Sequence, residues 1–140
     1  MREFRHFIDG AFTTGATGRS FDNIDPCTGQ VFGRVHEAGQ AEVDAACTAA
    51  RRALTGPWGR MAVRDRLAML EAVADGIAAR FDDFLDAECM DTGKPYSHAK
   101  RIDIPRGAAN FRVFADVVRQ QPTEAFRMDT ADGHGALNYS

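Results

Sequence analysis

The hydrophobic pattern of this chain changes its period once, near residue 36, and that change limits the possible folds more than any other feature. Residues 1–39 contain six of the thirteen glycines, with short apolar runs between them. Such runs, separated by turn residues, are typical of short β-strands. From Gln40 onward the apolar residues recur every three or four positions, which indicates amphipathic helices. The sequence therefore predicts a β arm over residues 1–36 and a helical layer over residues 37–121.

The β arm is expected to be antiparallel. Residues 7–12 form two apolar halves around an Asp9-Gly10 turn signal, and residues 19–24 form a second stretch that ends before Pro26. A Pro-Cys-Thr-Gly turn at residues 26–29 then leads into a third short strand over residues 31–36.

Four to five helices are expected in the helical layer, separated by glycines and prolines that disfavour helix continuation. They cover residues 40–55, a stretch around residues 67–77, a stretch that has Asp82 as its N-cap, residues 97–104, and a last helix from Pro105 to about Gln120. Two weaker strand candidates, residues 125–128 and 136–140, lie in the remaining segment 122–140.

Charge and composition exclude several classes of function. Lys and Arg contribute 17 positive charges and Asp and Glu contribute 20 negative ones, so the formal net charge is −3. That balance leaves no basic excess for a nucleic-acid backbone. No uncharged apolar run is long enough to span a bilayer, and the first residues lack the apolar stretch of a signal peptide. We therefore expect a cytoplasmic protein with neither a nucleic-acid nor a membrane partner.

The cysteines and the motif content do not indicate a catalytic centre. The three cysteines are odd in number and widely spaced, which suits a reducing compartment. Cys47 and Cys89 fall on apolar helix faces, so we expect both to be buried as small hydrophobic residues. Cys27 lies in a turn, where it is either structural or an exposed, reactive thiol. Because serine-hydrolase, zinc-protease, Walker and dinucleotide motifs are absent from the sequence, no catalytic or cofactor-binding residue is predicted.

Two charged residues are expected at helix ends where the helix dipole disfavours them. Asp91 falls in the last turn of its helix, an unfavourable placement of about 0.3–1 kcal/mol. Either the nearby Lys94 or solvent compensates this charge, or the carboxylate and the carbonyls of the helix end bind a cation. Arg106 falls in the first turn of the last helix, where it is either a solvated arginine or a bidentate clamp for a carboxylate.

Several segments resemble the opening of the NAD(P)-dependent aldehyde dehydrogenase superfamily. The resemblance runs from Phe7 to Ser140 and rests on the order and spacing of residues 7–10, 21–29, 35–46, 56–59, 91–95 and 110–115. Residues 102–111 (IDIPRGAANF) are similar to a narrower subgroup, the 2-hydroxymuconic and 2-aminomuconic semialdehyde dehydrogenases of aromatic meta-cleavage catabolism, and residues 124–126 and 136–139 fit it too. The resemblance implies an α/β fold, locally α+β, of which this chain forms the N-terminal part up to the start of the oligomerisation strands.

The resemblance also implies roles for the two unusually placed charges. In many family members the turn that matches Asn23 and Ile24, together with the position of Asp91, holds a monovalent cation, partly through backbone carbonyls. In the muconic subgroup the arginine that matches Arg106 grips the carboxylate of the substrate. The family uses NAD and forms homo-oligomers, and its dinucleotide loop, glutamate base and nucleophilic cysteine lie beyond the point that matches Ser140.

We therefore expect an N-terminal segment of an NAD-dependent enzyme that oxidises 2-hydroxymuconic semialdehyde, a carboxylate-bearing aldehyde, to the dicarboxylate. By itself the segment would be inactive. Residues 1–36 would form the β arm, residues 37–121 the helical layer of the cofactor-binding domain, and residues 122–140 the start of the oligomerisation arm. The alternatives are a non-catalytic truncated product and a stand-alone α+β interaction protein. The second to fourth helices of the layer each have one apolar face, which needs a partner surface.

Overall fold

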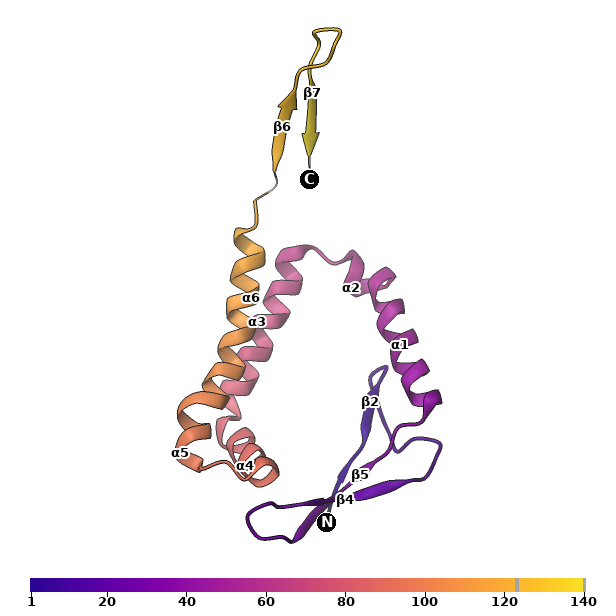
Figure 1. Ribbon diagram of the computed structural model, residues 1–140, viewed down its shortest axis with the longest axis vertical. Helices are drawn as coiled ribbons and strands as arrows, with labels where there is room; N and C mark the ends of the chain where they lie inside the picture. The colour runs from indigo at the N-terminus through magenta and orange to yellow at the C-terminus, as the bar shows by residue number, and fades with distance from the viewer. Residues whose placement is uncertain (123, 140) are drawn as a thin grey trace.

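The computed structural model describes residues 1–122 and 124–139 (Figure 1). Five strands come first: β1 (Arg2–Phe4), β2 (His6–Ile8), β3 (Ala11–Thr13), β4 (Ser20–Ile24) and β5 (Val31–His36). The helices follow: α1 (Gln40–Thr55), α2 (Pro57–Arg60), α3 (Val63–Ala79), α4 (Phe81–Thr92), α5 (Tyr96–His98), the π-helical turn η1 (Ala99–Asp103) and α6 (Ile104–Gln120). A hairpin of β6 (Ala125–Met128) and β7 (Ala136–Tyr139) extends beyond the end of α6. The predicted order of β arm, helices and terminal strands is confirmed, while Ser140 lies outside the described residues.

The β arm is only partly antiparallel, which corrects the sequence-based expectation. The pairs β2–β3 and β4–β5 are antiparallel, as predicted, but β1 pairs parallel with β5 at the edge of a sheet ordered β1-β5-β4. Gly33 of β5 makes room for β1, because a Cβ atom there would lie 2.4 Å from Cε2 of Phe4. Parallel strands need a long connection, and the residues between β1 and β5 supply it. The alternation of charge and aromatics in residues 1–6 does not reveal this long-range partner.

Glu42 fixes the start of α1 and ties it to the loop before β4. Its Oε2 accepts a hydrogen bond from the N–H of Gly39 and its Oε1 accepts one from the N–H of Ala16, both at 2.8 Å. Gly39 has no side chain to cap the helix, so the carboxylate three residues later satisfies its N–H. These two backbone hydrogen bonds lower the pKa of Glu42 below its ordinary value. The buried carboxylate therefore joins segments that are 26 residues apart.

Helices α3 and α6 pack side by side along their length (Figure 1). Small residues allow the close approach, since Ala74 of α3 and Ala115 of α6 are both completely buried. Two ion pairs flank this contact, Asp75 with Arg112 and Glu71 with Arg119. A hydrophobic cluster joins α4, η1 and the start of α6; its buried members are Leu85, Cys89, Ala99 and Ile104. The start of α6 is thereby fixed by a core of its own.

Two expectations for the helices are wrong in detail. Cys89 is buried, as predicted, but Cys47 is exposed, because the apolar stripe of α1 meets little of the rest of the described chain. Helix α4 begins at Phe81 after Arg80, so Asp82 lies in its first turn instead of serving as the N-cap. The Gly-Pro-Trp-Gly segment does end α1, and it forms the single helical turn α2.

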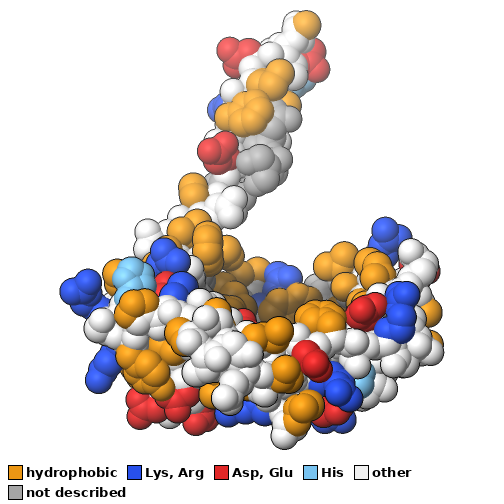
Figure 2. Space-filling view, turned by 60° about the horizontal axis from the view of Figure 1, so that its bottom comes forward, with side chains coloured by type: hydrophobic (Ala, Val, Ile, Leu, Met, Phe, Trp, Pro, Cys, Tyr) orange, Lys and Arg blue, Asp and Glu red, His pale blue; other side chains and the backbone are white. Residues whose placement is uncertain are grey.

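Large apolar side chains remain on the surface of the described residues. Figure 2 shows hydrophobic side chains over the helices and along the hairpin. The exposed set includes Val43, Leu54, Val113, Phe114, Val117, Phe126 and Leu137, each with about half or more of its surface accessible. Among residues 1–122 and 124–139, no helix combines the length and apolarity needed to cross a membrane.

We expect the exposed apolar surface of the chain to bind apolar dyes. We expect strong enhancement of 8-anilinonaphthalene sulfonate fluorescence, and a clear loss of it in the double variant Phe114→Glu/Val117→Glu, because these side chains lie on the exposed face of α6. The control Ser97→Glu/Arg101→Glu adds as many acidic groups at exposed positions of α5 and η1, away from that face. A chain that binds no dye would contradict the expectation.

The stability contributed by Glu42 is expected to depend on pH. Since the folded-state pKa is lowered from 4.5, the contribution is complete above pH 4.5 and is lost as the pH falls through the lower folded-state value. The urea midpoint should therefore fall less between pH 7 and pH 3 in Glu42→Gln than in the unaltered chain. Asp44→Asn is the matched control, because Asp44 accepts a hydrogen bond only from the exposed Gln40 side chain. Equal pH dependence in all three chains would contradict this role.

Candidate functional site

The fold brings Asn23 and Asp91 together from the ends of β4 and α4. The Nδ2 atom of Asn23 donates a hydrogen bond to Oδ1 of Asp91 at 2.8 Å across 68 residues of sequence. Lys94 does not compensate Asp91: its Nζ lies 2.7 Å from Oε1 of Glu88 and 3.2 Å from Oδ2 of Asp103. An amide donor from the β arm, not the nearby lysine, therefore contacts the carboxylate at the negative end of α4.

An irregularity in the sheet lies beside this contact. Asn23 pairs with Gly33 and Ile24 pairs with Val31, so Phe32 is an extra residue that interrupts the ladder. A β-bulge of this kind re-aims side chains and disrupts the regular backbone hydrogen bonds. The pocket that opens between the β arm and α4 has a volume of about 460 Å³, and its lining is Arg2, Phe4, Asn23, Phe32, Val35, Phe84, Ala87, Glu88, Asp91 and Ile104.

Gly93 allows the β arm to approach the end of α4. Its φ of 70° lies in the left-handed region that closes many helices. A Cβ atom at this position would lie 2.8 Å from Cγ of Pro26 and 3.3 Å from Sγ of Cys27. The thiol of Cys27 is exposed and lies 3.7 Å from the carbonyl oxygen of Gly93, which makes it a contact of the turn. Asp25 holds that turn by accepting a hydrogen bond from the N–H of Cys27, which lowers the pKa of its carboxyl group.

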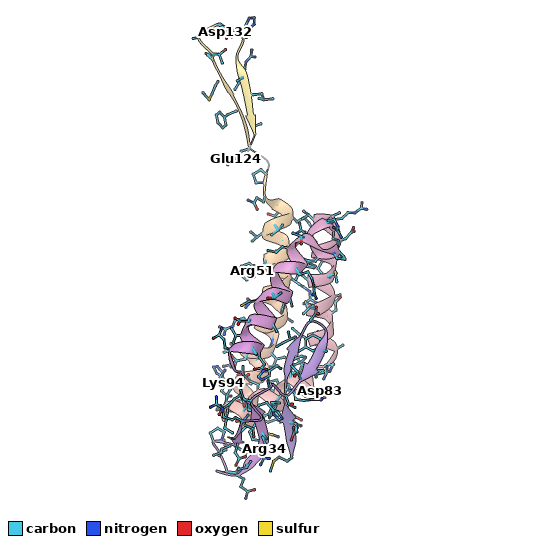
Figure 3. The ribbon with its side chains drawn as sticks, turned by 90° about the vertical axis from the view of Figure 1, so that its right-hand side faces the viewer. Arg34, Arg51, Asp83, Lys94, Glu124 and Asp132 are labelled. Carbon is cyan, nitrogen blue, oxygen red and sulfur yellow. The ribbon has the colours of Figure 1, made fainter. Side chains whose placement is uncertain are left out.

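Arg106 stands on the exposed side of the first turn of α6. Its side chain keeps 69% of its surface accessible, and its Nη2 lies 4.0 Å from Oδ1 of Asp103. Asp103 is the last residue of η1 and is only 15% accessible. Lys94, labelled near the lower end of the helices in Figure 3, is the closest cation to Asp103 among the described residues. The carboxylates of Glu88 and Asp103 raise the pKa of Lys94, so its ammonium group stays charged.

The chemistry that these groups can perform is binding, not bond making. An exposed guanidinium recognises carboxylates through paired N–H donors. A carboxylate with nearby backbone carbonyls is the donor type that hard cations prefer. Within the described residues no three His, Cys, Asp or Glu side chains converge as a metal site. The sequence also has no Gly-rich strand-to-helix turn to cradle a dinucleotide phosphate, so the residues of this chain do not by themselves fit NAD.

The sequence predicts Asn23, Ile24, Asp91 and Arg106 as candidate site residues, but it did not reveal the residues that contact them. Asp103 precedes Arg106 by three positions on a helical turn, a spacing that brings side chains together. The three-residue spacing could therefore have predicted the contact between Asp103 and Arg106. The contact of Lys94 with Asp103 had no such signal, because it depends on the π-helical turn between them.

Comparison with known proteins gives a consistent result. The profile of the aldehyde dehydrogenase family matches residues 12–139. The 2-hydroxymuconic semialdehyde dehydrogenase of Pseudomonas sp. (strain CF600) is 63% identical over 140 residues, which cover 100% of this chain and 29% of that protein. A 2-aminomuconic 6-semialdehyde dehydrogenase of Pseudomonas sp. is 46% identical over 100% of this chain and 28% of its own length. This chain thus spans less than a third of the curated relatives it matches.

Solved structures agree with these relatives. The NAD+ complex of an aldehyde dehydrogenase from Bacillus cereus superposes with a TM-score of 0.85 at 32% identity, covering 89% of this chain and 26% of that one. An aldehyde dehydrogenase from Burkholderia cenocepacia, assigned to γ-glutamyl-γ-aminobutyraldehyde, gives a TM-score of 0.87 at 35% identity over 92% of this chain and 26% of its own.

Replacement of Gly93 by alanine is expected to weaken the contact between the β arm and α4. The left-handed backbone costs a non-glycine residue about 1–2 kcal/mol, and the clash with Pro26 adds to it. The free energy of unfolding, measured with urea, should fall by at least that amount. Gly76→Ala is the matched control with the opposite sign, because Gly76 lies inside α3 with nothing near its Cβ position, and alanine there should stabilise by about 0.5–1 kcal/mol. A Gly93→Ala chain as stable as the original would refute the packing argument.

Proposed function

The chain belongs to the aldehyde dehydrogenase family, and we propose that it forms the N-terminal part of an NAD-dependent 2-hydroxymuconic semialdehyde dehydrogenase. The observation that carries the proposal is the 63% identity to such an enzyme across all 140 residues. A second relative of the same name, from Pseudomonas putida, is 52% identical over 99% of this chain. Oxidation of the aldehyde group of this substrate gives a dicarboxylate.

Arg106 is proposed to bind the carboxylate of the substrate. It is exposed, it carries a permanent charge, and its guanidinium offers the planar fork that matches a carboxylate. Ile104 is buried two residues earlier, so packing holds the helix turn that carries Arg106. NAD, if held by the longer enzyme, would supply the oxidant, and Arg106 would orient the substrate through its carboxylate.

Asn23, Ile24 and Asp91 are proposed to hold a monovalent cation. Asp91 forms no ion pair within the described part of the chain, and its position at the negative end of α4 favours a positive partner. The bulge next to Asn23 and Ile24 frees backbone groups from the regular ladder, which supports carbonyl ligation. The donors are oxygen atoms, which suits a hard cation.

The three segments are proposed to have separate tasks in the longer enzyme. Residues 1–36 form the β arm, residues 37–121 the helical layer of the cofactor-binding domain, and residues 122–140 the start of an oligomerisation arm. The hairpin of β6 and β7 stands away from the helices with Phe126 and Leu137 exposed, which supports assembly into a homo-oligomer. We also propose a cytoplasmic location, since Cys27, Cys47 and Cys89 are all free thiols.

A chimera tests the function of this chain directly. Residues 1–140 replace the matching region of the Pseudomonas enzyme that is 63% identical, and the purified chimera is assayed with 2-hydroxymuconic semialdehyde and NAD. We expect activity close to that of the parent, because the replaced surfaces are similar. An oligomeric, folded chimera without activity would contradict the proposal and favour a non-catalytic interaction protein.

Arg106→Ala in the chimera tests the carboxylate clamp. The loss of a hydrogen-bonded ion pair should reduce kcat/KM for 2-hydroxymuconic semialdehyde by about 10- to 100-fold, with little effect on the neutral substrate butyraldehyde. Arg101→Ala is the matched control, since Arg101 is an exposed arginine of η1 outside the site. Equal losses for the charged and the neutral aldehyde would refute the clamp.

A further inference from the structure

We infer that Asp103 is a counter-ion of Arg106 within this chain. It weakens the binding of carboxylates to the arginine and so favours release of the dicarboxylate product. The inference rests on the proposed function, because it concerns the same arginine. It adds a residue that touches neither substrate nor cofactor and acts only through Arg106.

The two oxygens of Asp103 face different partners. Oδ1 lies 4.0 Å from Nη2 of Arg106, whereas Oδ2 lies 3.2 Å from Nζ of Lys94 and 4.0 Å from Nε2 of His98. Oδ2 is buried and has no hydrogen bond of normal geometry, so its contact with Lys94 is a charge contact. Because Lys94 also binds Glu88 at 2.7 Å, one ammonium group serves two carboxylates. Lys94 therefore neutralises the charge of Asp103 only in part, and the remaining negative charge acts on Arg106.

The geometry decides the sign of the effect. A separation of 4.0 Å is too long for a hydrogen bond, so Asp103 does not orient the guanidinium by direct donation. Its charge nevertheless acts at that distance, where two unit charges still attract or repel through solvent. A carboxylate that approaches Arg106 meets the attraction of the guanidinium and the repulsion of Asp103. Removal of the Asp103 charge should therefore strengthen carboxylate binding, whereas loss of an orienting contact would weaken it.

The counter-ion affects release of the product as well as capture of the substrate. The aldehyde substrate and the dicarboxylate product both carry the carboxylate that Arg106 is proposed to bind, so an unopposed arginine would hold both more strongly. Asp103 remains beside Arg106 as its counter-ion when the product leaves. Because Arg106 is exposed to solvent, a ligand carboxylate can bind to it and leave it while Asp103 stays nearby.

The experiment uses Asp103→Asn in the chimeric enzyme described above. We expect a two- to fivefold lower KM for 2-hydroxymuconic semialdehyde, about the range that exposed ion pairs span. The Kd of the dicarboxylate product, measured by isothermal titration calorimetry, should fall by a similar factor. Both effects should shrink as the salt concentration rises, because exposed charges are screened. Values for butyraldehyde should not change.

Two further variants separate the counter-ion from a structural role. His98→Lys, at a half-exposed position 4.0 Å from Oδ2 of Asp103, adds a competing cation and should lower KM in the same direction. Asp103→Glu retains the charge and should behave like the unaltered enzyme. Asp83→Asn, which removes a surface carboxylate paired with Arg80 on α4, is the neutral control and should leave KM unchanged.

A double-mutant cycle with Arg106→Ala completes the test. The effects of Asp103→Asn and His98→Lys on KM should disappear when Arg106 is absent. If they persist, or if Asp103→Asn raises KM or leaves it unchanged, the counter-ion is refuted while the clamp stands. If Arg106→Ala affects charged and neutral aldehydes alike, the proposed substrate role fails first, and the inference fails with it.

Discussion

The ammonium group of Lys94 holds two carboxylates, Glu88 of α4 and Asp103 at the end of η1, and the arrangement of the site depends on this bridge. Glu88 and Asp91 belong to the same helix, while Asp103 and Arg106 share the turn that begins α6. The bridge therefore links the helix that carries the candidate cation position to the turn that carries the candidate carboxylate position. The shared ammonium group offsets the repulsion between the two carboxylates.

Asp91 and Arg106, the two charges expected at helix ends, have partners of different kinds. Asp91, at the negative end of α4, accepts a hydrogen bond from the neutral amide of Asn23. Arg106 does not lie at a free helix end, which corrects the expectation, because the backbone stays helical from Tyr96 through η1 into α6; it lies near the carboxylate of Asp103. The neutral amide of Asn23 stabilises Asp91 without cancelling its negative charge. The carboxylate of Asp103, by contrast, reduces the positive potential of Arg106. The two positions thus differ in how much of their charge remains available to a ligand.

Local patterns in the sequence predicted most of the elements, and long-range contacts account for what was missed. Periodicity and turn residues located β2 to β5, the helices and the terminal hairpin. The parallel pairing of β1 depends on the space left at Gly33, which no local pattern encodes. The exposure of Cys47 was missed because an apolar stripe indicates only that a helix can be buried, not that a partner covers it. In the same way, the three-residue spacing indicates the contact of Asp103 with Arg106. The contact of Asp103 with Lys94 depends on the π-helical turn, which no local pattern predicts.

The candidate site lies in the part of the chain that has its own core. Leu85, Cys89, Ala99 and Ile104 form a continuous cluster beneath Asp103 and Arg106, while the outer faces of α1 and α6 are exposed. A side chain on a turn whose neighbours are buried keeps its position regardless of what covers distant surfaces. The polar cap at Glu42 and the small contacts with the β2–β3 hairpin hold α1 instead. The position of the turn that carries Arg106 is accordingly supported by the packing of η1, α4 and the start of α6.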